Sequence, residues 1–368
     1  MTATTTTRAT ATPVVAADGR RTLRSWHDEV RALHAAGRTG EAIDLLGRLT
    51  EAVPSEPRLR HGLVALLRAD GRAVDADRLA VELDPNDAGA WCRLSRHARC
   101  TQDLDLFVEA SLGWEAARPG DPTVAHFAAI ARQIRDGHTH ARPEAGYIAE
   151  LFDHYADRFE GHLAKLGYRG PDVMADLVAD LIGDGELRAD STLADLGCGT
   201  GLVGDRLRDA TPWNGHLTGV DLSPRMLDHA AARTFDSRPV YDAVAEADFV
   251  DYLDTVPTGL DAVVAADAFI YVGDLRPVFA ATARALRPGG WLVATLERLA
   301  PGDTAATTAN GFRADLSGRY LHDDDWVERE LLTAGFDVVV VEPMSVRREG
   351  HRPTPGSVVV AHLPRHAP

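Results

Sequence analysis

Positive charge is scarce in this sequence, and lysine is nearly missing from it. Only 39 of the 368 residues are Lys or Arg, against 55 Asp or Glu, so the formal net charge at pH 7 is −16. A negative field of this size opposes binding to the phosphates of nucleic acids and to anionic membrane surfaces. We therefore expect neither a nucleic acid nor a membrane among the partners of the chain.

The near-absence of lysine also excludes two kinds of site. Lys165 is the only lysine, so the chain has no phosphate-binding loop of the form G-x-x-x-x-G-K-[ST]. The C-terminal half has no lysine that could form a Schiff base with a carbonyl substrate. Neither P-loop nor Schiff-base chemistry is expected.

Cysteines and long apolar runs are few as well. Cys92, Cys100 and Cys198 lack metal-ligand spacing and are too few for a disulfide framework, which predicts no metal site and a reducing, cytoplasmic location. No run of 18 apolar residues occurs, so we expect no membrane-spanning helix. Residues 1–21 are rich in Thr and Ala, and we interpret them as a disordered tail, with a transit peptide as the alternative.

What the chain does contain is enough length and apolar surface for two domains. Residues 22–137 have helical periodicity throughout, with Gly-containing turns between paired helices. Pro54, Pro85 and Pro119 close successive units at spacings of 31 and 34 residues. This layout resembles degenerate tetratricopeptide repeats and implies an all-α domain. Such repeats could hold a protein partner, mediate self-association or wall an active site; alternatively, the helices merely cap the next domain.

Residues 138–190 are expected to form a linker and a helical lid that lead into the second domain. The stretch 136–146 is polar and contains Pro and Gly, as linkers do. After it, apolar and aromatic residues recur at helical spacing: Tyr147, Leu151, Phe152, Tyr155, Phe159 and Leu163. Core packing is the simpler interpretation of this stripe, and a lid over a nearby site is the alternative.

From residue 191 to 368 the pattern changes to strands that alternate with helices, which predicts an α/β domain with a mostly parallel sheet. The two strands 336–342 and 356–362 are joined without a helical pattern, so they should be antiparallel. We expect strands at 192–196, 216–221, 261–267, 290–296, 336–342 and 356–362, and helices near 201–209, 224–234, 274–286 and 323–334.

The stretch "LADLGCGTG" places three glycines where the first strand of this domain ends. Gly197, Gly199 and Gly201 allow positive φ angles and a close approach of a ligand to the backbone. Asp195 precedes them, where it would repel a pyrophosphate but attract the cationic amino end of an amino acid. A dinucleotide-binding turn favours G-x-G-x-x-G, and here the third glycine comes one residue early.

Acidic residues follow the next strands in turn. Asp221 ends the second strand, where a carboxylate can accept both hydroxyls of a ribose. Leu222 and Met226 are placed to sandwich an adenine, and Asp248 could accept from its exocyclic amine. Two further residues complete this set, Phe249 beside Asp248 and Asp267 at the end of another buried strand.

These motifs, with "LRPGGWLV", resemble the class I S-adenosylmethionine-dependent methyltransferases over about residues 145–364. The flanking "YIAELFDHYADRFEGHL" and "VRREGHRPTPGSVVV" are similar to those of a bacterial subgroup preceded by tetratricopeptide repeats. The resemblance implies a Rossmann-like seven-stranded sheet of order 3-2-1-4-5-7-6 with strand 7 antiparallel. It also implies that S-adenosyl-L-methionine is the cofactor and S-adenosyl-L-homocysteine the product.

Carried over to this chain, the resemblance places Gly197, Gly199 and Gly201 along the methionine part and Asp221 at the ribose. It places Asp248 and Phe249 beside the adenine and Asp267 near the sulfonium, and implies that Tyr147 and Tyr155 close over the cofactor. Candidate catalytic groups are Tyr271, His322 and Tyr155. Glu297, Tyr320, Arg347, Arg348 and Glu349 stand on the same loops; the arginines could hold an acceptor carboxylate or simply pair with acidic residues.

The function expected from this resemblance is in-line methyl transfer to an O, N, S or C nucleophile of a small molecule. One alternative is a methyltransferase that acts on a partner protein docked on the repeats. Another is a regulatory or assembly protein that binds the cofactor without methyl transfer. A nicotinamide-dependent dehydrogenase is disfavoured by the glycine spacing.

Overall fold

The computed structural model of the chain describes residues 23–138, 140–300, 310–349 and 352–365. The disordered tail expected at residues 1–21 lies outside these ranges. The chain divides into two compact units, residues 1–120 and 121–368. None of the described helices is long and apolar enough to span a membrane.

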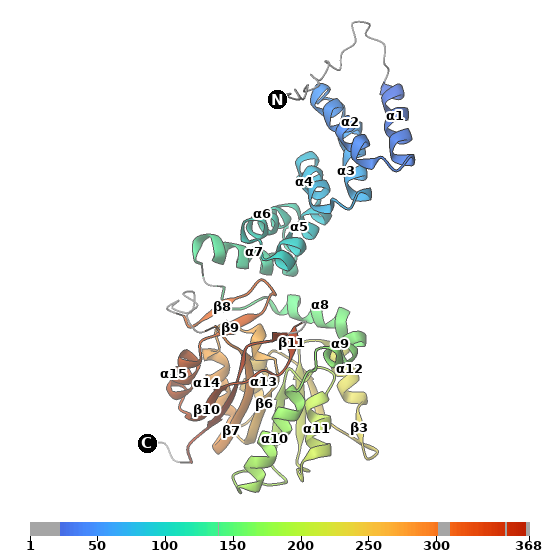
Figure 1. The fold of residues 1–368 in the computed structure, drawn as a ribbon. Helices are drawn as coiled ribbons and strands as arrows, with labels where there is room; N and C mark the ends of the chain where they lie inside the picture. Colours follow the sequence, from blue (N-terminus) through green and yellow to red (C-terminus); the bar gives the residue numbers. More distant parts are fainter. Residues whose placement is uncertain (1–22, 139, 301–309, 350–351, 366–368) are drawn as a thin grey trace, which may run out of the picture. The chain divides into compact units, whose positions relative to one another are not determined.

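The first unit is all-helical, as the periodicity predicts, and consecutive helices pack on one another (Figure 1). The helix at residues 39–52, for example, buries an apolar stripe that includes Ile43, Leu46 and Leu49. Aspartates cap two of the helices: Asp87 accepts from the N–H of Ala90 and Asp103 from that of Leu106. The six helices described in this unit are α1 (Leu23–Ala35), α2 (Thr39–Ala52), α3 (Pro57–Ala69), α4 (Ala73–Leu83), α5 (Ala88–Thr101) and α6 (Leu104–Ala117).

The next helix, α7 (Pro122–Asp136), belongs to the second unit, although the predicted domain boundary was residue 137. Its buried side chains explain this. The ring of His126 bonds the carbonyl oxygen of Gly318 at 2.9 Å, and the amide of Gln133 donates to the carbonyl oxygen of Ala314 at 3.0 Å. Helical periodicity alone does not reveal these partners, because they lie almost two hundred residues further along the chain.

The stretch predicted as a helical lid is broken into three pieces: α8 (Ala145–Tyr155), a 3-10 turn η1 (Ala156–Arg158) and α9 (Phe159–Lys165). We call residues 145–165 the lid segment. A further helix, α10 (Gly170–Gly183), leads from it to the sheet, and its apolar face is buried at Val173, Met174 and Val178.

The second unit is built on a seven-stranded sheet of order β10-β13-β7-β6-β1-β2-β5. Numbered along the chain, this is the order 3-2-1-4-5-7-6 read from its other edge, so the expected topology is confirmed. β13 is antiparallel to both of its neighbours, and the other pairings are parallel. The strands are β1 (Leu193–Leu196), β2 (Leu217–Asp221), β5 (Ala243–Glu246), β6 (Leu260–Ala265), β7 (Leu286–Glu297), β10 (Asp337–Pro343) and β13 (Gly356–His362).

Two kinds of strand were missed by the pattern. β5 is a four-residue edge strand with mostly exposed side chains, so it carries no buried apolar run. The others form two-stranded hairpins outside the main sheet, whose strands are two or three residues long. They are β3 (Thr234–Phe235) with β4 (Arg238–Pro239), β8 (Phe312–Ala314) with β9 (Tyr320–His322), and β11 (Arg348–Glu349) with β12 (Arg352–Pro353).

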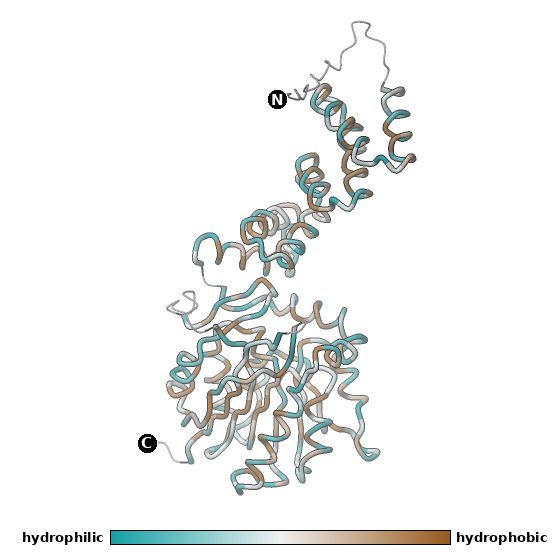
Figure 2. Tube along the Cα trace, in the orientation of Figure 1, coloured by the Kyte–Doolittle hydropathy of each residue, from teal (hydrophilic) through white to brown (hydrophobic). Residues whose placement is uncertain are grey.

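Helices cover both faces of the sheet, and the central strands are correspondingly apolar (Figure 2). α10 packs beside α11, while α13, α14 and α15 pack in succession. Right-handed crossovers put α11 and α12 on one face and α13 and α14 on the other, because the direction of strand addition reverses after β5. The bounds are α11 (Leu202–Ala210), α12 (Pro224–Ala232), α13 (Phe249–Thr255), η2 (Phe269–Tyr271), α14 (Arg276–Ala285) and α15 (Asp324–Thr333).

Candidate functional site

The candidate site is the turn between β1 and α11, at the carboxyl end of the parallel strands. Gly197, Gly199 and Gly201 all have left-handed backbone, with φ of 70°, 53° and 90°. The N–H groups of Gly197 and Cys198 donate to the carbonyl oxygen of Val220 on β2, at 2.7 and 3.0 Å. The backbone of β2 therefore fixes the start of the turn.

Gly197 shows why a side chain is not tolerated here. A Cβ at this position would lie 2.5 Å from the Cβ of Ala268, a separation that forces one backbone or the other to move. Gly199 is less crowded, since a Cβ added there would meet only the ring of Phe159, at 3.4 Å. The turn is thus pressed against the loop after β6 on one side and reached by the lid segment on the other.

Asp221, the predicted ribose ligand, is held in place by backbone donors. The N–H of Gly199 donates to its Oδ2 and the N–H of Ser223 to its Oδ1, both at 2.9 Å. Burial raises the pKa of this carboxyl, and the two N–H groups act against that shift. A carboxylate oxygen accepts more than one hydrogen bond, so both oxygens keep capacity for a ligand.

Asp195 lies one strand away and is fully buried. The hydroxyl of Tyr241 donates to its Oδ2 at 2.7 Å, whereas Oδ1 has no hydrogen-bond partner among the described residues. Burial raises the pKa of Asp195 to about 7. The hydroxyl of Thr200, in the glycine turn, is likewise buried without a partner in the described part of the chain. Two unsatisfied polar atoms beside one turn are typical of a ligand site.

Asp248 and Phe249 follow β5, but their side chains have structural partners. Asp248 caps α13 by accepting from the N–H of Val250 at 3.0 Å, and it forms an ion pair with Arg142. Phe249 is buried against Phe269, with a ring separation of 5.9 Å. Their predicted adenine contacts stay predictions.

The two apolar residues predicted beside Asp221 differ in exposure. Leu222 is half-buried, whereas Met226 is fully buried in the first turn of α12. The N–H of Met226 donates to the hydroxyl of Ser223, which caps this helix at 3.1 Å. Leu222 keeps accessible surface for a ligand, and Met226 contributes mainly to the core beneath it.

Asp267 belongs to a buried cluster of charges at the ends of β6 and β7. Its φ of 52° is left-handed, and the hydroxyl of Thr295 donates to its Oδ1 at 3.1 Å. Arg347 pairs with both Asp267 and Glu297, and all three are largely buried. Arg319 pairs with Glu297 at 2.5 Å. Of the two roles predicted for Arg347, this arrangement favours pairing with carboxylates, although in the interior and not at the surface.

The lid segment brings an aromatic row to this edge of the sheet. The ring of Phe152 meets that of Tyr271 edge to face at 5.2 Å, and Phe159 meets Phe152 at 6.1 Å. Tyr155 packs on Phe159 at 5.7 Å. Burial raises the pKa of Tyr271 to about 12 and raises that of Tyr155 as well. Both phenols are therefore protonated at neutral pH.

Tyr147 and His322 are both buried and have structural partners. Tyr147 stacks on His126 of α7 at 4.5 Å, and its predicted contact with the cofactor stays a prediction. His322 is buried, and its Nε2 lies 3.0 Å from the carbonyl oxygens of Val272 and Gly273. Burial lowers the pKa of His322 to about 4. Its donating nitrogen is occupied by backbone, which favours a structural role.

Several residues at the site were not predicted. Tyr241 orients Asp195, and Ser223 orients Asp221. Arg233 donates from Nε to the carbonyl oxygen of Thr200 in the glycine turn at 2.9 Å. The spacing of charges in the sequence could have indicated two charged helix faces. Arg225, His229 and Arg233 repeat at helical intervals, as do the acidic residues 153, 157 and 160 of the lid segment.

Comparison with known proteins bears on the domain that holds this site. Residues 193–290 match the family model of a methyltransferase domain. The malonyl-[acyl-carrier protein] O-methyltransferase of Hahella chejuensis (strain KCTC 2396) is 36% identical over 104 residues, which cover 27% of this chain and 34% of that protein. The ubiquinone biosynthesis O-methyltransferase of Thiobacillus denitrificans (strain ATCC 25259 / T1) is 29% identical over 137 residues, covering 37% and 57%.

A solved structure of magnesium protoporphyrin IX methyltransferase from Synechocystis PCC 6803 with bound SAH is similar at a TM-score of 0.45. It is 17% identical, and the match covers 59% of this chain and 98% of that one. The chain spans only 28% to 57% of the length of the curated relatives it matches. The match to the family model spans the glycine turn, Asp221 and Asp267. The stretch that matches a methyltransferase domain therefore lies within a Rossmann-like sheet.

Proposed function

We propose that this chain transfers a methyl group from S-adenosyl-L-methionine to a small-molecule acceptor. The observation that carries the proposal is the pairing of an all-left-handed glycine turn with Asp221, inside a segment that matches a methyltransferase domain. Oδ1 of Asp195 and Oγ1 of Thr200 are buried without a partner among the described residues, and they fit a ligand with a cationic amino group and further polar atoms.

When bound, the cofactor supplies an activated methyl group on a sulfonium, which an acceptor nucleophile displaces in line. The task of the protein is then to align the two reactants and exclude water. Asp221 would hold the ribose hydroxyls through the lone pairs that the N–H groups of Gly199 and Ser223 leave free. The aromatic row of the lid segment, Phe152, Tyr155 and Phe159, would keep water from the glycine turn.

The three predicted catalytic residues do not include a strong base. Tyr271 and Tyr155 are phenols with raised pKa, and His322 already donates to backbone carbonyls. A base is needed only where the acceptor is a poor nucleophile in its dominant protonation state. The proposed acceptor is therefore one that is nucleophilic by itself. Both curated relatives described above are named as O-methyltransferases, which supports testing acidic hydroxyls and carboxylates first.

A partner protein as the acceptor is the second candidate. The observation that favours it is the separate helical unit of residues 23–120, whose paired helices are of the kind that bind peptides in repeat proteins. Its resemblance to tetratricopeptide repeats remains part of this proposal, as do self-association and a cytoplasmic location.

Two measurements test the proposal. S-Adenosylhomocysteine should raise the melting temperature of the full-length chain, whereas NAD should not; a rise with NAD alone would end the methyltransferase assignment. The chain is then incubated with methyl-labelled cofactor and an extract of its host, separated into small molecules and protein. Label in the small-molecule fraction supports the first acceptor class. Label in protein, abolished by removal of residues 1–120, supports the second.

A further inference from the structure

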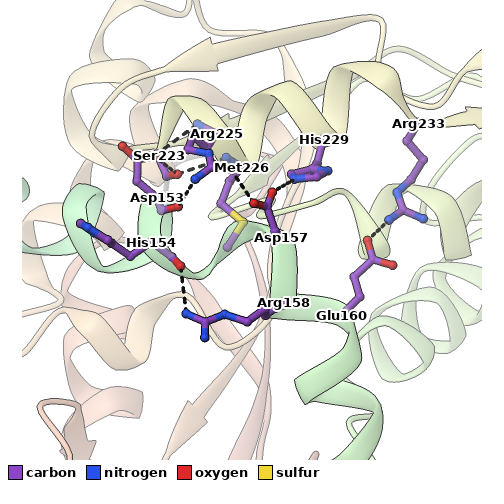
Figure 3. A network of polar contacts seen from close by, with 10 residues as sticks. All are labelled: Asp153, His154, Asp157, Arg158, Glu160, Ser223, Arg225, Met226, His229 and Arg233. Carbon is purple, nitrogen blue, oxygen red and sulfur yellow. Dashed lines mark hydrogen bonds and ion pairs between the residues drawn. The ribbon is translucent and has the colours of Figure 1, made fainter.

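The lid segment and α12 face each other with opposite charge (Figure 3). Acidic side chains of the lid segment, Asp153, Asp157 and Glu160, meet polar and basic groups along the whole length of α12. We call these three residues, together with Ser223, Arg225, His229 and Arg233, the latch. In the aromatic row of the same segment, Phe152 packs on Tyr271, and Phe159 lies where a Cβ added at Gly199 would meet its ring. One stretch of chain therefore carries both the cover of the site and its attachment.

At the start of α12 the latch reaches the predicted ribose ligand. The hydroxyl of Ser223 donates to Oδ1 of Asp153 at 2.6 Å, and the N–H of Arg225 approaches the same oxygen at 3.3 Å. The N–H of Ser223 donates in turn to Asp221. A continuous hydrogen-bonded chain thus runs from the lid segment through Ser223 to Asp221.

At the end of α12 the latch reaches the glycine turn. Glu160 forms an ion pair with Arg233. Arg233 also donates to the carbonyl oxygen of Thr200 at 2.9 Å and lies 3.3 Å from Asp205. Only 19% of the Arg233 side chain is exposed, against 48% for Glu160. Arg233 is therefore a fixed part of the turn, and Glu160 is the part that can leave.

The middle of the latch is open to water. Arg225 pairs with Asp157 at 2.7 Å and His229 lies 3.4 Å from the same carboxylate. The exposed fractions are 49% for Arg225 and 64% for Asp157. Exposed ion pairs are individually weak and are screened by salt. Contacts of this strength favour the closed position of the lid segment but still allow it to open.

We propose that the latch positions the lid segment over the bound cofactor, and that Asp157 and Glu160 set how fast the cofactor leaves. Closing the lid would complete the contacts that fix Asp221 and Thr200, and opening it would free the turn for exchange. The proposal rests on the proposed function, because it needs a ligand at the glycine turn. Asp157 and Glu160 are positioning residues that act through Arg225 and Arg233.

The experiment measures the rate at which S-adenosylhomocysteine leaves the full-length chain. Radiolabelled ligand is bound, and an excess of unlabelled ligand is added. Asp157→Asn and Glu160→Gln should each speed release about two- to fivefold, and the double variant about tenfold, as expected for exposed pairs. Asp254→Asn is the matched control, since Asp254 forms an exposed pair with Arg284 at 2.5 Å outside the latch; its rate should equal that of the wild type.

Charge is tested separately from folding by salt and by a swap. Release from the wild type should quicken about tenfold between 50 mM and 500 mM salt, and the double variant should lose most of this dependence. Asp157→Arg should speed release, and Arg225→Asp added to it should bring the rate back within about twofold of the wild type. A loss of structure alone would not be rescued by the swap.

The outcomes separate the two proposals. If the wild type does not bind S-adenosylhomocysteine, the proposed function fails and the latch fails with it. If the wild type binds the ligand and the double variant releases it at the rate of the Asp254→Asn control, the proposed role of the latch is wrong and the proposed function is unaffected. Faster release with an unchanged salt dependence, or a swap that worsens release, also overturns it. Hydrogen exchange at residues 145–165 should slow on binding in the wild type more than in the double variant.

Discussion

The two halves of the sheet's carboxyl edge are built from different kinds of interaction. Beside β1 and β2, backbone groups do most of the holding: the glycine turn bonds to Val220, and two N–H groups fix Asp221. Beside β6 and β7, side chains of opposite charge hold one another, with Arg347 between Asp267 and Glu297. The first half leaves polar atoms for a ligand, whereas the charges of the second half already compensate each other.

This difference determines which half of the edge can be predicted from the sequence. A backbone conformation is encoded locally, so nine consecutive residues are enough to indicate the glycine turn. The charge cluster joins positions 267, 297, 319 and 347, which no short motif links. Only the first half therefore has a recognisable signature in the sequence.

The largest effect is expected from removing the shared arginine. Arg347→Met should lower the free energy of unfolding by about 3–5 kcal/mol, because Asp267 would be left buried without its cation and Glu297 would keep only Arg319. The affinity for S-adenosylhomocysteine should change by less than about threefold if the halves are independent. Chemical denaturation and calorimetry measure the two quantities. Arg284→Met, in an exposed pair, is the control and should cost less than about 1 kcal/mol.

The next largest effect is the change in stability with pH that Asp195 causes. Its folded pKa of about 7 lies above the unfolded value, so the native state binds more protons between about pH 4 and 7 and loses stability as pH rises through that window. The loss is on the order of 4 kcal/mol. Asp195→Asn should remove it, so the variant should be the more stable protein at pH 8 without ligand.

The contribution of His322 to the pH dependence of stability has the opposite sign. Its pKa is lowered to about 4, so the native state loses stability as pH falls below the unfolded pKa. The informative quantity is therefore the difference between wild type and Asp195→Asn, measured from pH 4 to 8. If the difference in the free energy of unfolding between the two proteins does not grow with pH, the raised pKa of Asp195 is contradicted. The same variant should bind S-adenosylhomocysteine more weakly if Asp195 faces its amino group.

A third prediction separates the halves by affinity. Asp221→Asn should weaken S-adenosylhomocysteine binding about 100-fold, or roughly 2.7 kcal/mol, since one oxygen is lost to the ribose and to a backbone donor. Glu297→Gln, in the other half, should leave the affinity within about threefold. Equal losses in both variants would show that the two halves form one binding unit.

The smallest effect is expected from removing the first helical unit. A chain that begins at residue 121 should bind S-adenosylhomocysteine as the full chain does, because α7 and its contacts with Gly318 and Ala314 are kept. A chain that begins at residue 141 loses these contacts and should melt at a lower temperature. If both truncated chains melt at the same temperature, α7 does not stabilise the hairpin of β8 and β9.

These cases show how far the sequence could lead. The antiparallel β13 and the positive φ angles of the glycines were predicted correctly from chain connectivity and local pattern. The strand order was also predicted correctly, but from the resemblance to a known family. The contacts of individual buried side chains were not predictable. His322 and Tyr147 stood at suitable places in the chain, yet packing turned His322 toward backbone carbonyls and Tyr147 toward His126. Such partners lie on distant elements, which periodicity cannot identify.

The amide of Gln133 has one further consequence. It donates to the carbonyl oxygen of Ala314 and accepts from the N–H of the same residue, at 3.0 and 3.3 Å, as a neighbouring strand would. An unpaired strand edge is a template for association with another chain. The side chain of Gln133 thus pairs both backbone groups of Ala314 on β8, and its removal should favour aggregation through this strand edge.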